Sequence, residues 1–521
     1  MGAALPVEKV WAICFPFRLY GGKEGNGFPR LPEPMGFCPA DKSHVAALPA
    51  FSFREGNRRS GRKRGREARP IWHILPGVCP GGFDSNERGE ISMEEHGSVN
   101  SRYDYWHPEK RFGLFIHWGI YALTEWHEQA QMRARIPREE YERLPERFRP
   151  SHFDPEAWVL AAKDAGMRYL CFTTKHHDGF CMWDTHQTDY KVTNTPYGRD
   201  VLKELSLACE KHGMALCLYY SIPDWHHPNA YNPKSTHQIP PRPSDVPDMA
   251  RYIAYVKAQV KELLTGYGKI WGFFWDIPPQ IHDPSVNELV RGLQPGIMIN
   301  DRGFDQGDFS TPERFVPEGK AFRRPTEACQ SLGRQAWGYR ADEDYYSLGI
   351  LTSSIDRIMA MGGNYLLNVG PMPDGRFPPE AQALLRAVGG WYHRVRESFE
   401  GAAPASGLMP GREDFLLTRK GKDFYFHFPQ GLESSGLLLN PIGTLPREAV
   451  ILNNGARPLC ALDEMPTLHD IPGGPRPFLH LSQLSPDRLA GEAVVLRLTF
   501  DHPEEVELAC AGLDASRESR F

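Results

Sequence analysis

The chain has 521 residues, of which 41% are hydrophobic and 12% aromatic, and its formal net charge is −5. This length predicts a folded protein with more than one domain, although a barrel of about 250 residues would count as one. The slightly negative charge favours neither nucleic acid nor an anionic membrane as a partner. No run approaches the roughly 18 apolar residues that a membrane span requires.

The ten cysteines are scattered and form no C-x-x-C pair, and Cys171 and Cys217 lie inside apolar runs. This usage predicts buried free thiols and a reducing compartment. The N-terminus lacks the basic, apolar and small-residue segments of a signal peptide. We therefore expect a cytoplasmic protein.

Residues 1–92 differ in composition from the rest of the chain. They are rich in Gly, Pro and Arg, include "RRSGRKRGREARP", and hold 14 basic against 9 acidic residues. A basic tail for nucleic acid or targeting is one interpretation. The others are a disordered extension and a natural start at Met93. We favour these two, so residues 1–92 are expected to be a disordered basic extension that need not belong to the working protein.

Residues 93–400 are predicted to form one catalytic domain, in which short apolar runs alternate with longer helical patterns from about residue 112. Residues 154–166 illustrate the helices, with Asp154 as N-terminal cap, Pro155 at the first position and Gly166 as C-terminal cap. Continuous apolar runs between such helices are typical of parallel strands buried on both faces. The runs are "FGLFIHWGIY", "YLCFTTK", "ALCLYYS", "WGFFWD", "IMIND" and "NYLLNVG".

These repeated units predict an α/β fold, either a (β/α) barrel or a doubly wound sheet. Polar residues cluster where the runs end, as expected for a barrel whose active site lies at the carboxyl ends of its strands. No G-x-G-x-x-G or P-loop follows the first run. We therefore predict a TIM-like barrel. The polar residues are His117, His176, His177, Asp224, Asp276 and Asp301.

The residue pattern changes after residue 400, where "DFLLTRKGKDFYFHFPQ" indicates two strands around a turn. Further β-rich runs follow. A small β-sandwich over residues 401–510 is predicted, with residues 511–521 as a loose tail.

Asp276 ends a run that is otherwise apolar or aromatic, and a carboxylate there loses hydration unless it has partners or a chemical role. The following loop region offers Glu313, Glu318 and Glu327. Two carboxylates that flank one bond are what glycoside hydrolysis requires. The alternative is a structural Asp276 that pairs with an arginine or caps a turn.

His117, His176 and His177 allow two interpretations. They could bind a metal, as in metal-dependent barrel hydrolases, but the first strand carries one histidine and no H-x-H. They could instead hydrogen-bond sugar hydroxyls, with tryptophans as apolar platforms. The alternative is that one of the adjacent histidines is a structural residue that points away from the site, since side chains alternate along a strand.

Several motifs in order closely resemble the α-L-fucosidases of glycoside hydrolase family 29 over about residues 100–400. They are "RFGLFIHWGIYA", "TTKHHDGFCMWDT", "YYSIPDWHHP", "WDIPP", "EACQSLGRQAWGY" and "NYLLNVGPMPDG". The resemblance implies a (β/α) barrel with a C-terminal β-sandwich. It also implies retaining, exo-acting hydrolysis of terminal α-L-fucose from fucosylated oligosaccharides or glycoconjugates, without a cofactor or a metal.

Carried over residue by residue, the resemblance makes Asp276 the nucleophile. Glu313 of "TPE" is the first choice for the acid/base, and Glu327 of "EAC" is the second. Tyr220 is preferred to Tyr219 within "YYS". The substrate-binding positions are His117, Glu125, Trp126, His176, His177, Tyr220, Arg302 and Trp337.

One departure concerns the nucleophile motif, because many members follow the aspartate with glycine and this chain has Ile277. The "TPER" and "EAC" pattern looks more like the subgroup that prefers α-1,3- and α-1,4-linked fucose. Two other hypotheses stay open from sequence alone: a metal-dependent barrel hydrolase and a non-catalytic fucose-binding protein.

Overall fold

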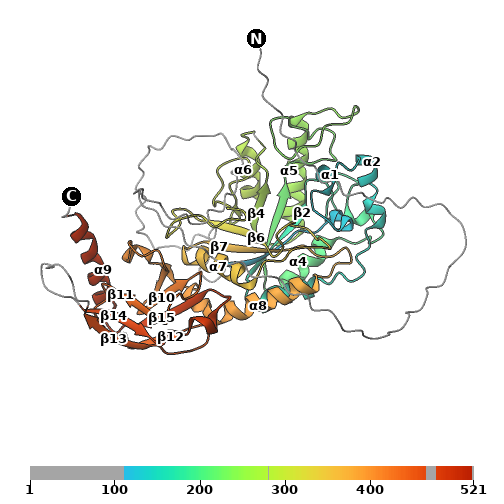
Figure 1. Ribbon diagram of the computed structural model, residues 1–521. Coiled ribbons are helices and arrows are strands. Elements are labelled where there is room, and N and C mark those ends of the chain that lie inside the picture. The colour runs from blue at the N-terminus through green and yellow to red at the C-terminus, as the bar shows by residue number, and fades with distance from the viewer. Residues whose placement is uncertain (1–110, 280, 465–476, 519–521) are drawn as a thin grey trace, which may run out of the picture. The chain divides into compact units, whose positions relative to one another are not determined.

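The computed structural model describes residues 111–279, 281–464 and 477–518 (Figure 1). The basic extension predicted at 1–92 lies outside these described residues, as does the start of the predicted barrel, 93–110. Among the described helices, none is long and apolar enough to cross a membrane. The seven cysteines described as free thiols are all at least partly buried.

A seven-stranded parallel sheet forms the first part, in the order β5-β4-β3-β2-β1-β7-β6. Every residue of β2 and β3 is buried, which explains their continuous apolar sequences. The strands are β1 Phe112–Ile116, β2 Tyr169–Lys175, β3 Ala215–Ser221, β4 Ile270–Asp276, β5 Met298–Ile299, β6 Glu327–Ser331 and β7 Asn364–Val369.

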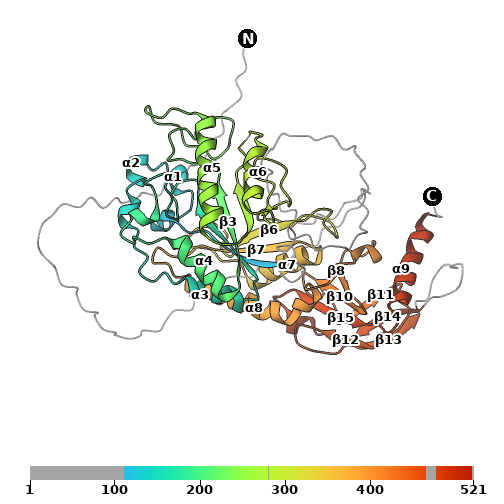
Figure 2. The ribbon, with the colours of Figure 1, turned by 180° about the vertical axis from the view of Figure 1, so that it is seen from behind.

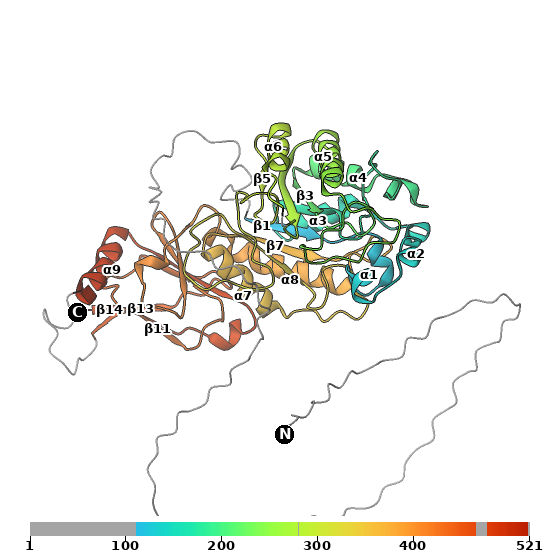
Figure 3. The same ribbon diagram turned by 90° about the horizontal axis from the view of Figure 1, so that it is seen from above.

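Helices lie around these strands, as Figures 2 and 3 show. The predicted helix after Asp154 is confirmed, because the Asp154 carboxylate accepts a hydrogen bond from the Ala157 amide and Gly166 follows the helix with φ +84°. The helices are α1 Ala130–Arg133, α2 Arg138–Tyr141, α3 Pro155–Asp164, α4 Val201–His212, α5 Met249–Gly266, α6 Pro284–Leu293, α7 Leu348–Ala360 and α8 Pro379–Val395.

No described helix lies between β5 and β6, and the connecting chain runs beside both strands instead. Three parallel bridges place it there: Asn300 with Phe309, Ser310 with Thr326, and Glu313 with Cys329. This segment, 309–313, therefore occupies a strand-like position next to β6. Glu313 is thereby held against the sheet although it lies in a loop.

The C-terminal part contains a five-stranded and a three-stranded antiparallel sheet. Side chains from both sheets belong to one hydrophobic core. The strands are β8 Ala403–Pro404, β9 Leu416–Lys420, β10 Asp423–Phe428, β11 Gly436–Leu439, β12 Glu448–Ile451, β13 Leu459–Glu464, β14 Pro477–Ser482 and β15 Val494–Thr499.

The end of this part differs from expectation, and its five-stranded sheet contacts the first part. Helix α9 spans Pro503–Glu518, so the tail predicted from residue 511 is wrong up to residue 518. The five-stranded sheet also contributes Leu416 and Tyr425 to the hydrophobic core of the first part. A buried pair joins the two parts, because Asp356 of α7 and His427 of β10 approach to 2.8 Å with no side-chain exposure.

Candidate active site

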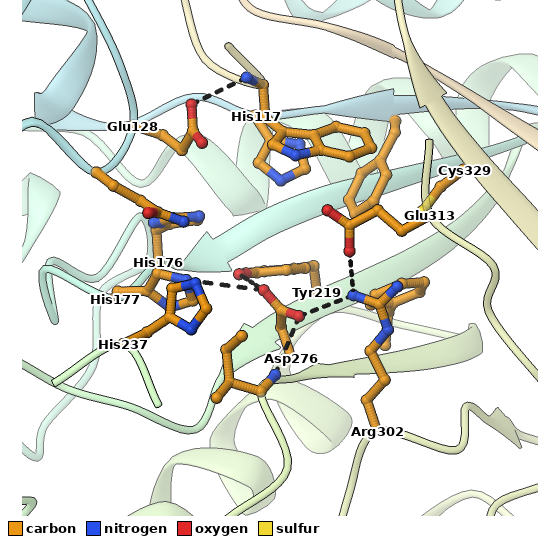
Figure 4. Close-up of a pocket in the computed structure, with 15 residues that line it drawn as sticks. His117, Glu128, His176, His177, Tyr219, His237, Asp276, Arg302, Glu313 and Cys329 are labelled. Carbon is orange, nitrogen blue, oxygen red and sulfur yellow. Dashed lines mark hydrogen bonds and ion pairs between the residues drawn. The ribbon is translucent and has the colours of Figure 1, made fainter. Parts of the chain in front are cut away.

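A pocket at the carboxyl ends of the parallel strands gathers most of the predicted site residues (Figure 4). Seven of them line it, and four do not: Glu125, Trp126, Tyr220 and Glu327. The lining is Phe115, His117, Glu128, Gln129, His176, His177, Tyr219, His237, Phe274, Asp276, Ile277, Arg302, Glu313, Cys329 and Trp337.

Asp276 ends β4 and is held at both carboxylate oxygens. Its Oδ2 accepts a hydrogen bond of 2.7 Å from the Tyr219 hydroxyl, and its Oδ1 accepts one of 3.1 Å from Arg302 Nη1. The Ile277 amide also donates to Oδ1, at 3.0 Å, and Ile277 adopts a left-handed φ of +59° to do so. Burial alone would raise the pKa of Asp276, but Arg302, His177 and the hydrogen bonds outweigh it and lower the pKa. Asp276 is therefore an ionised and oriented carboxylate.

Arg302 connects Asp276 to Glu313. The same nitrogen, Nη1, donates to Glu313 Oε2 at 2.7 Å and to Asp276 Oδ1 at 3.1 Å (Figure 4). The two oxygens are therefore at most 5.8 Å apart, the sum of the 2.7 and 3.1 Å contacts. Carboxyl groups about 5–5.5 Å apart are typical of retaining glycosidases, whereas inverting enzymes separate them by about 6.5–9.5 Å.

His117 is held as a neutral ring. Its Nδ1 lies 2.7 Å from Asn368 Oδ1, and the Asn368 amide nitrogen donates to the Trp337 carbonyl at 2.7 Å. Because the amide nitrogen is used in this way, Asn368 Oδ1 accepts the proton on His117 Nδ1. Burial lowers the pKa of His117 despite the nearby carboxylates. Nε2 is therefore a hydrogen-bond acceptor.

The His177 ring is likewise neutral, with its proton on Nδ1. Ser221 donates its hydroxyl proton to the Pro223 carbonyl at 2.6 Å, so Ser221 Oγ accepts from His177 Nδ1 at 2.7 Å. Nε2 then faces Asp276 Oδ2 at 3.8 Å. Burial lowers the pKa of His177 to about 4, so the ring is neutral at ordinary pH.

His176 lines the pocket beside His177, stacked on the Tyr219 ring at 5.6 Å between centroids. Both adjacent histidines line the pocket, so the alternative that one of them points away does not hold. Strand alternation does not apply to them, because β2 ends at Lys175. His176 Nδ1 is buried without a hydrogen-bond partner among the described residues, and burial holds the pKa of this ring well below 6.5.

Tyr219, and not Tyr220, faces the pocket, so the preference for Tyr220 is wrong. The two side chains alternate across β3. Tyr220 points the other way and donates to Gln259 of α5 at 2.6 Å. Because side chains alternate along a strand, one of the two tyrosines in "YYS" must face inward, but only the strand register decides which one.

The predicted pair Glu125–Trp126 does not line the pocket, and Glu128 and Gln129 do. A short 3-10 turn, Ile120–Thr124, ends at Glu125 in a left-handed conformation with φ +52°. This turn leaves Glu125 exposed and brings Glu128 inward. Glu128 Oε2 accepts the Trp337 and Gly338 amides at 2.9 and 3.0 Å. Its buried Oε1 makes no hydrogen bond among the described residues but lies 3.2 Å from His127 Nδ1.

Glu327 begins β6 and is buried away from the pocket, where it accepts a 2.7 Å hydrogen bond from the Tyr169 hydroxyl. Glu327 faces the same side of β6 as Cys329, two residues further on, but it lies at the start of the strand, and Cys329 is the β6 residue that lines the pocket. Of the two predicted acid/base candidates, Glu313 is thus the one that lines the pocket. Among the described residues, no group of three or more His, Cys, Asp and Glu side chains is arranged to hold a metal ion.

Asp178 lies directly after the paired histidines and is fully buried. Its Oδ2 accepts from the Tyr141 hydroxyl at 3.0 Å and its Oδ1 accepts from the Phe180 amide at 3.1 Å. Burial is the main cause that raises the pKa of Asp178 to about 7 from 3.8. Ionisation of this carboxyl therefore opposes folding.

Because the folded pKa exceeds the unfolded one, the stabilisation linked to Asp178 is complete below about pH 4 and is lost as the pH rises to about 7. Asp178→Asn should remove this loss. Relative to the wild type, we expect the variant to gain a few kcal/mol between about pH 5 and about pH 8. Thermal unfolding of both proteins across this range measures the gain, and parallel curves would contradict it.

The sequence model of the family described as "Alpha-L-fucosidase" matches residues 84–397. The tissue alpha-L-fucosidase of Bos taurus is 27% identical over 382 residues, which cover 67% of this chain and 79% of the bovine protein. The structure is similar to that of alpha-L-fucosidase isoenzyme 1 from Paenibacillus thiaminolyticus, with a TM-score of 0.68 and 33% identity over 77% of this chain and 100% of that one.

A GH29 alpha-L-fucosidase from Bacteroides thetaiotaomicron, trapped as a covalent intermediate with 2-fluoro-fucosyl fluoride, matches with a TM-score of 0.63 and 27% identity over 78% of this chain and 98% of that one. A covalent intermediate is the mark of a retaining, double-displacement mechanism. The fold and the site thus define a retaining glycoside hydrolase. The chain belongs to the α-L-fucosidase family.

Proposed function

We propose that this enzyme releases terminal α-L-fucose with Asp276 as nucleophile and Glu313 as acid/base. One observation carries the assignment: two carboxylates contact a single nitrogen of Arg302, which brings their oxygens within 5.8 Å, the sum of 3.1 and 2.7 Å. The two carboxylates also differ in environment. The Asp276 side chain is 13% exposed and that of Glu313 is 40% exposed, as suits a more enclosed nucleophile and an acid that exchanges protons with water.

In the first step, protonated Glu313 gives its proton to the glycosidic oxygen as Asp276 Oδ2 or Oδ1 attacks the anomeric carbon. The bond to the aglycone breaks, and a fucosyl ester of Asp276 forms. In the second step, the Glu313 carboxylate takes a proton from water, the water oxygen attacks the anomeric carbon, and the ester bond breaks. Arg302, which contacts both carboxylates, compensates the charge that moves between them.

The neutral histidines would hold the sugar. Nε2 of His117 and Nε2 of His177 are acceptors for hydroxyl groups, because both Nδ1 protons are already used inside the protein. The Trp337 ring stacks with His117 at 5.2 Å and provides an apolar wall for a sugar face. Glu128, which lines the pocket and whose Oε1 makes no hydrogen bond among the described residues, is a further acceptor that the family motifs did not indicate.

Three finer features are part of the same proposal. The parallel sheet and the segment 309–313 form a TIM-like barrel, and the two antiparallel sheets around their shared core form a β-sandwich. The substrate is a fucosylated oligosaccharide or glycoconjugate. The resemblance of "TPER" and "EAC" favours α-1,3 or α-1,4 linkage.

The direct test is release of the chromophore from an aryl α-L-fucoside, with the anomeric configuration of the first-formed fucose followed by NMR. Turnover with α-L-fucose as the initial product supports the proposal. Binding of fucose without turnover of aryl and oligosaccharide substrates, or β-L-fucose as the initial product, would overturn it.

Tyr219→Phe should lower kcat by about tenfold or more, because it removes a hydrogen bond to the charged nucleophile. Tyr220→Phe is the matched control and loses only the bond to Gln259. It should cost about 1 kcal/mol of stability and leave kcat unchanged. Steady-state kinetics and thermal unfolding of both variants check this prediction. Equal effects on kcat would show that the orientation of the two tyrosines is wrong.

The acidic limb of kcat/KM should lie near or below pH 4. The pKa of Asp276 is lowered from 3.8, and that of His177 is lowered to about 4. As the pH falls through these values, the Asp276 carboxylate gains a proton. Nε2 of His177 also gains a proton and can then no longer accept a hydrogen bond. A pH–rate profile, with recovery of activity at neutral pH as the control for unfolding, measures the limb. A midpoint near that of an ordinary histidine, about 6.5, would contradict it.

A further inference from the structure

Arg314 follows Glu313, and their side chains diverge. Glu313 turns to Arg302 in the pocket, whereas Arg314 reaches the segment that follows β6. The backbone of Arg314 has a left-handed φ of +57°, which is uncommon for a residue with a side chain. Its amide donates to the Cys329 carbonyl at 3.0 Å, so this conformation is held in place by β6.

The Arg314 guanidinium binds three carbonyl oxygens of that segment. Nη1 donates to Arg334 at 2.9 Å and to Gly333 at 3.3 Å, and Nη2 donates to Ala336 at 3.0 Å. The same guanidinium lies 4.5 Å from the centre of the Trp337 ring, which is a cation–π distance. Arg314 therefore fixes both the backbone that leads to Trp337 and the ring itself.

Other charged groups around this segment hold its amides and not its carbonyls. Glu343 accepts the amides of Gln335 and Ala336 at 2.7 and 3.1 Å. Glu128 accepts the amides of Trp337 and Gly338. Among the described contacts, Arg314 alone joins the carbonyls of residues 333–336 to the chain that carries Glu313.

We propose that Arg314 is a positioning residue that couples the acid/base carboxylate to the aromatic wall of the sugar pocket. The inference rests on the proposed role of Glu313 and extends it. Because residues 313 and 314 are adjacent, a displacement of the 333–337 segment is transmitted to the Glu313 carboxylate, and the reverse. The consequence is that proton delivery to the leaving oxygen depends on a residue that does not touch the substrate.

If Arg314 had a purely structural role, its substitution should give a different result. Its loss would lower the unfolding temperature and reduce turnover of all substrates in proportion. A positioning residue instead makes the rate depend on how much the leaving group needs a proton. The ratio of kcat/KM for para-nitrophenyl α-L-fucoside, a good leaving group, to that for phenyl α-L-fucoside, a poor one, separates the two cases.

The test uses Arg314→Ala, Arg314→Lys, Glu313→Ala and the double variant. Arg323→Ala is the matched control, an exposed arginine of the same loop region. Arg314→Ala should raise the ratio by about tenfold to a hundredfold, as displaced catalytic groups do. Added guanidinium ion should restore part of the loss, and lysine should not, because it lacks the fork that reaches several carbonyls. Arg323→Ala should leave the ratio unchanged.

In the Glu313→Ala background, Arg314→Ala should add no further change to the ratio, because the group that it positions is gone. An unchanged ratio in Arg314→Ala, beside a raised ratio in Glu313→Ala, would overturn this inference alone. An unchanged ratio in Glu313→Ala would overturn the acid/base assignment itself. Independent, multiplicative effects of the two substitutions on the ratio would show that Arg314 does not act through Glu313.

Discussion

Asp276→Ala is expected to reduce turnover of an aryl α-L-fucoside by about a thousandfold or more, because the variant has no group to form the fucosyl ester. Sodium azide should restore activity, since the vacated volume admits a small anion. Attack by azide replaces the first displacement alone, so the product should be β-L-fucosyl azide, with inverted configuration. NMR of the product identifies it.

Asp301→Asn is the matched control for this experiment. Asp301 also follows a strand of the parallel sheet, but it lies outside the pocket and accepts a 3.1 Å hydrogen bond from Thr311. The asparagine keeps that acceptor, so activity should stay within about twofold of the wild type. If Asp276→Ala were as active as this control, or if azide gave the α-azide, Asp276 would not be the nucleophile.

Glu313→Ala should produce a different pattern. Loss of general acid catalysis should slow phenyl α-L-fucoside by about 10²–10⁴-fold and para-nitrophenyl α-L-fucoside much less, because the better leaving group departs without a proton. Azide should here accelerate breakdown of the fucosyl ester, and the product should be α-L-fucosyl azide, with retained configuration. Kinetics on both substrates with and without azide measure this.

Glu327→Gln separates the two acid candidates. Glu327 is buried against Tyr169, so its change should lower the unfolding temperature and affect both substrates in the same proportion. If instead Glu327→Gln shows the leaving-group dependence and Glu313→Ala does not, the acid/base assignment is reversed. The azide products then identify which carboxylate faces the departing aglycone.

The sequence by itself determined the parallel α/β fold, the family and most of the pocket. Strand and helix signals are local, since the Asp154 cap and the continuous apolar runs act over a few residues. Asp276 and His117 could be predicted because a polar residue that ends a buried strand is conspicuous in the chain. Arg302 and Trp337 came from the motifs that this chain shares with its family.

Only the tertiary structure decided the orientation of neighbouring residues. Tyr219 and Tyr220 are alike in sequence, and the register of β3 against β4 turns Tyr219 toward Asp276. A left-handed turn at Glu125 moves the acidic pocket residue to Glu128. Glu313 and Glu327 both precede Trp337, and the pairing of Glu313 with Cys329 brings Glu313 to the pocket. These choices depend on strand pairing and on single backbone angles, which are fixed by contacts between segments far apart in the chain.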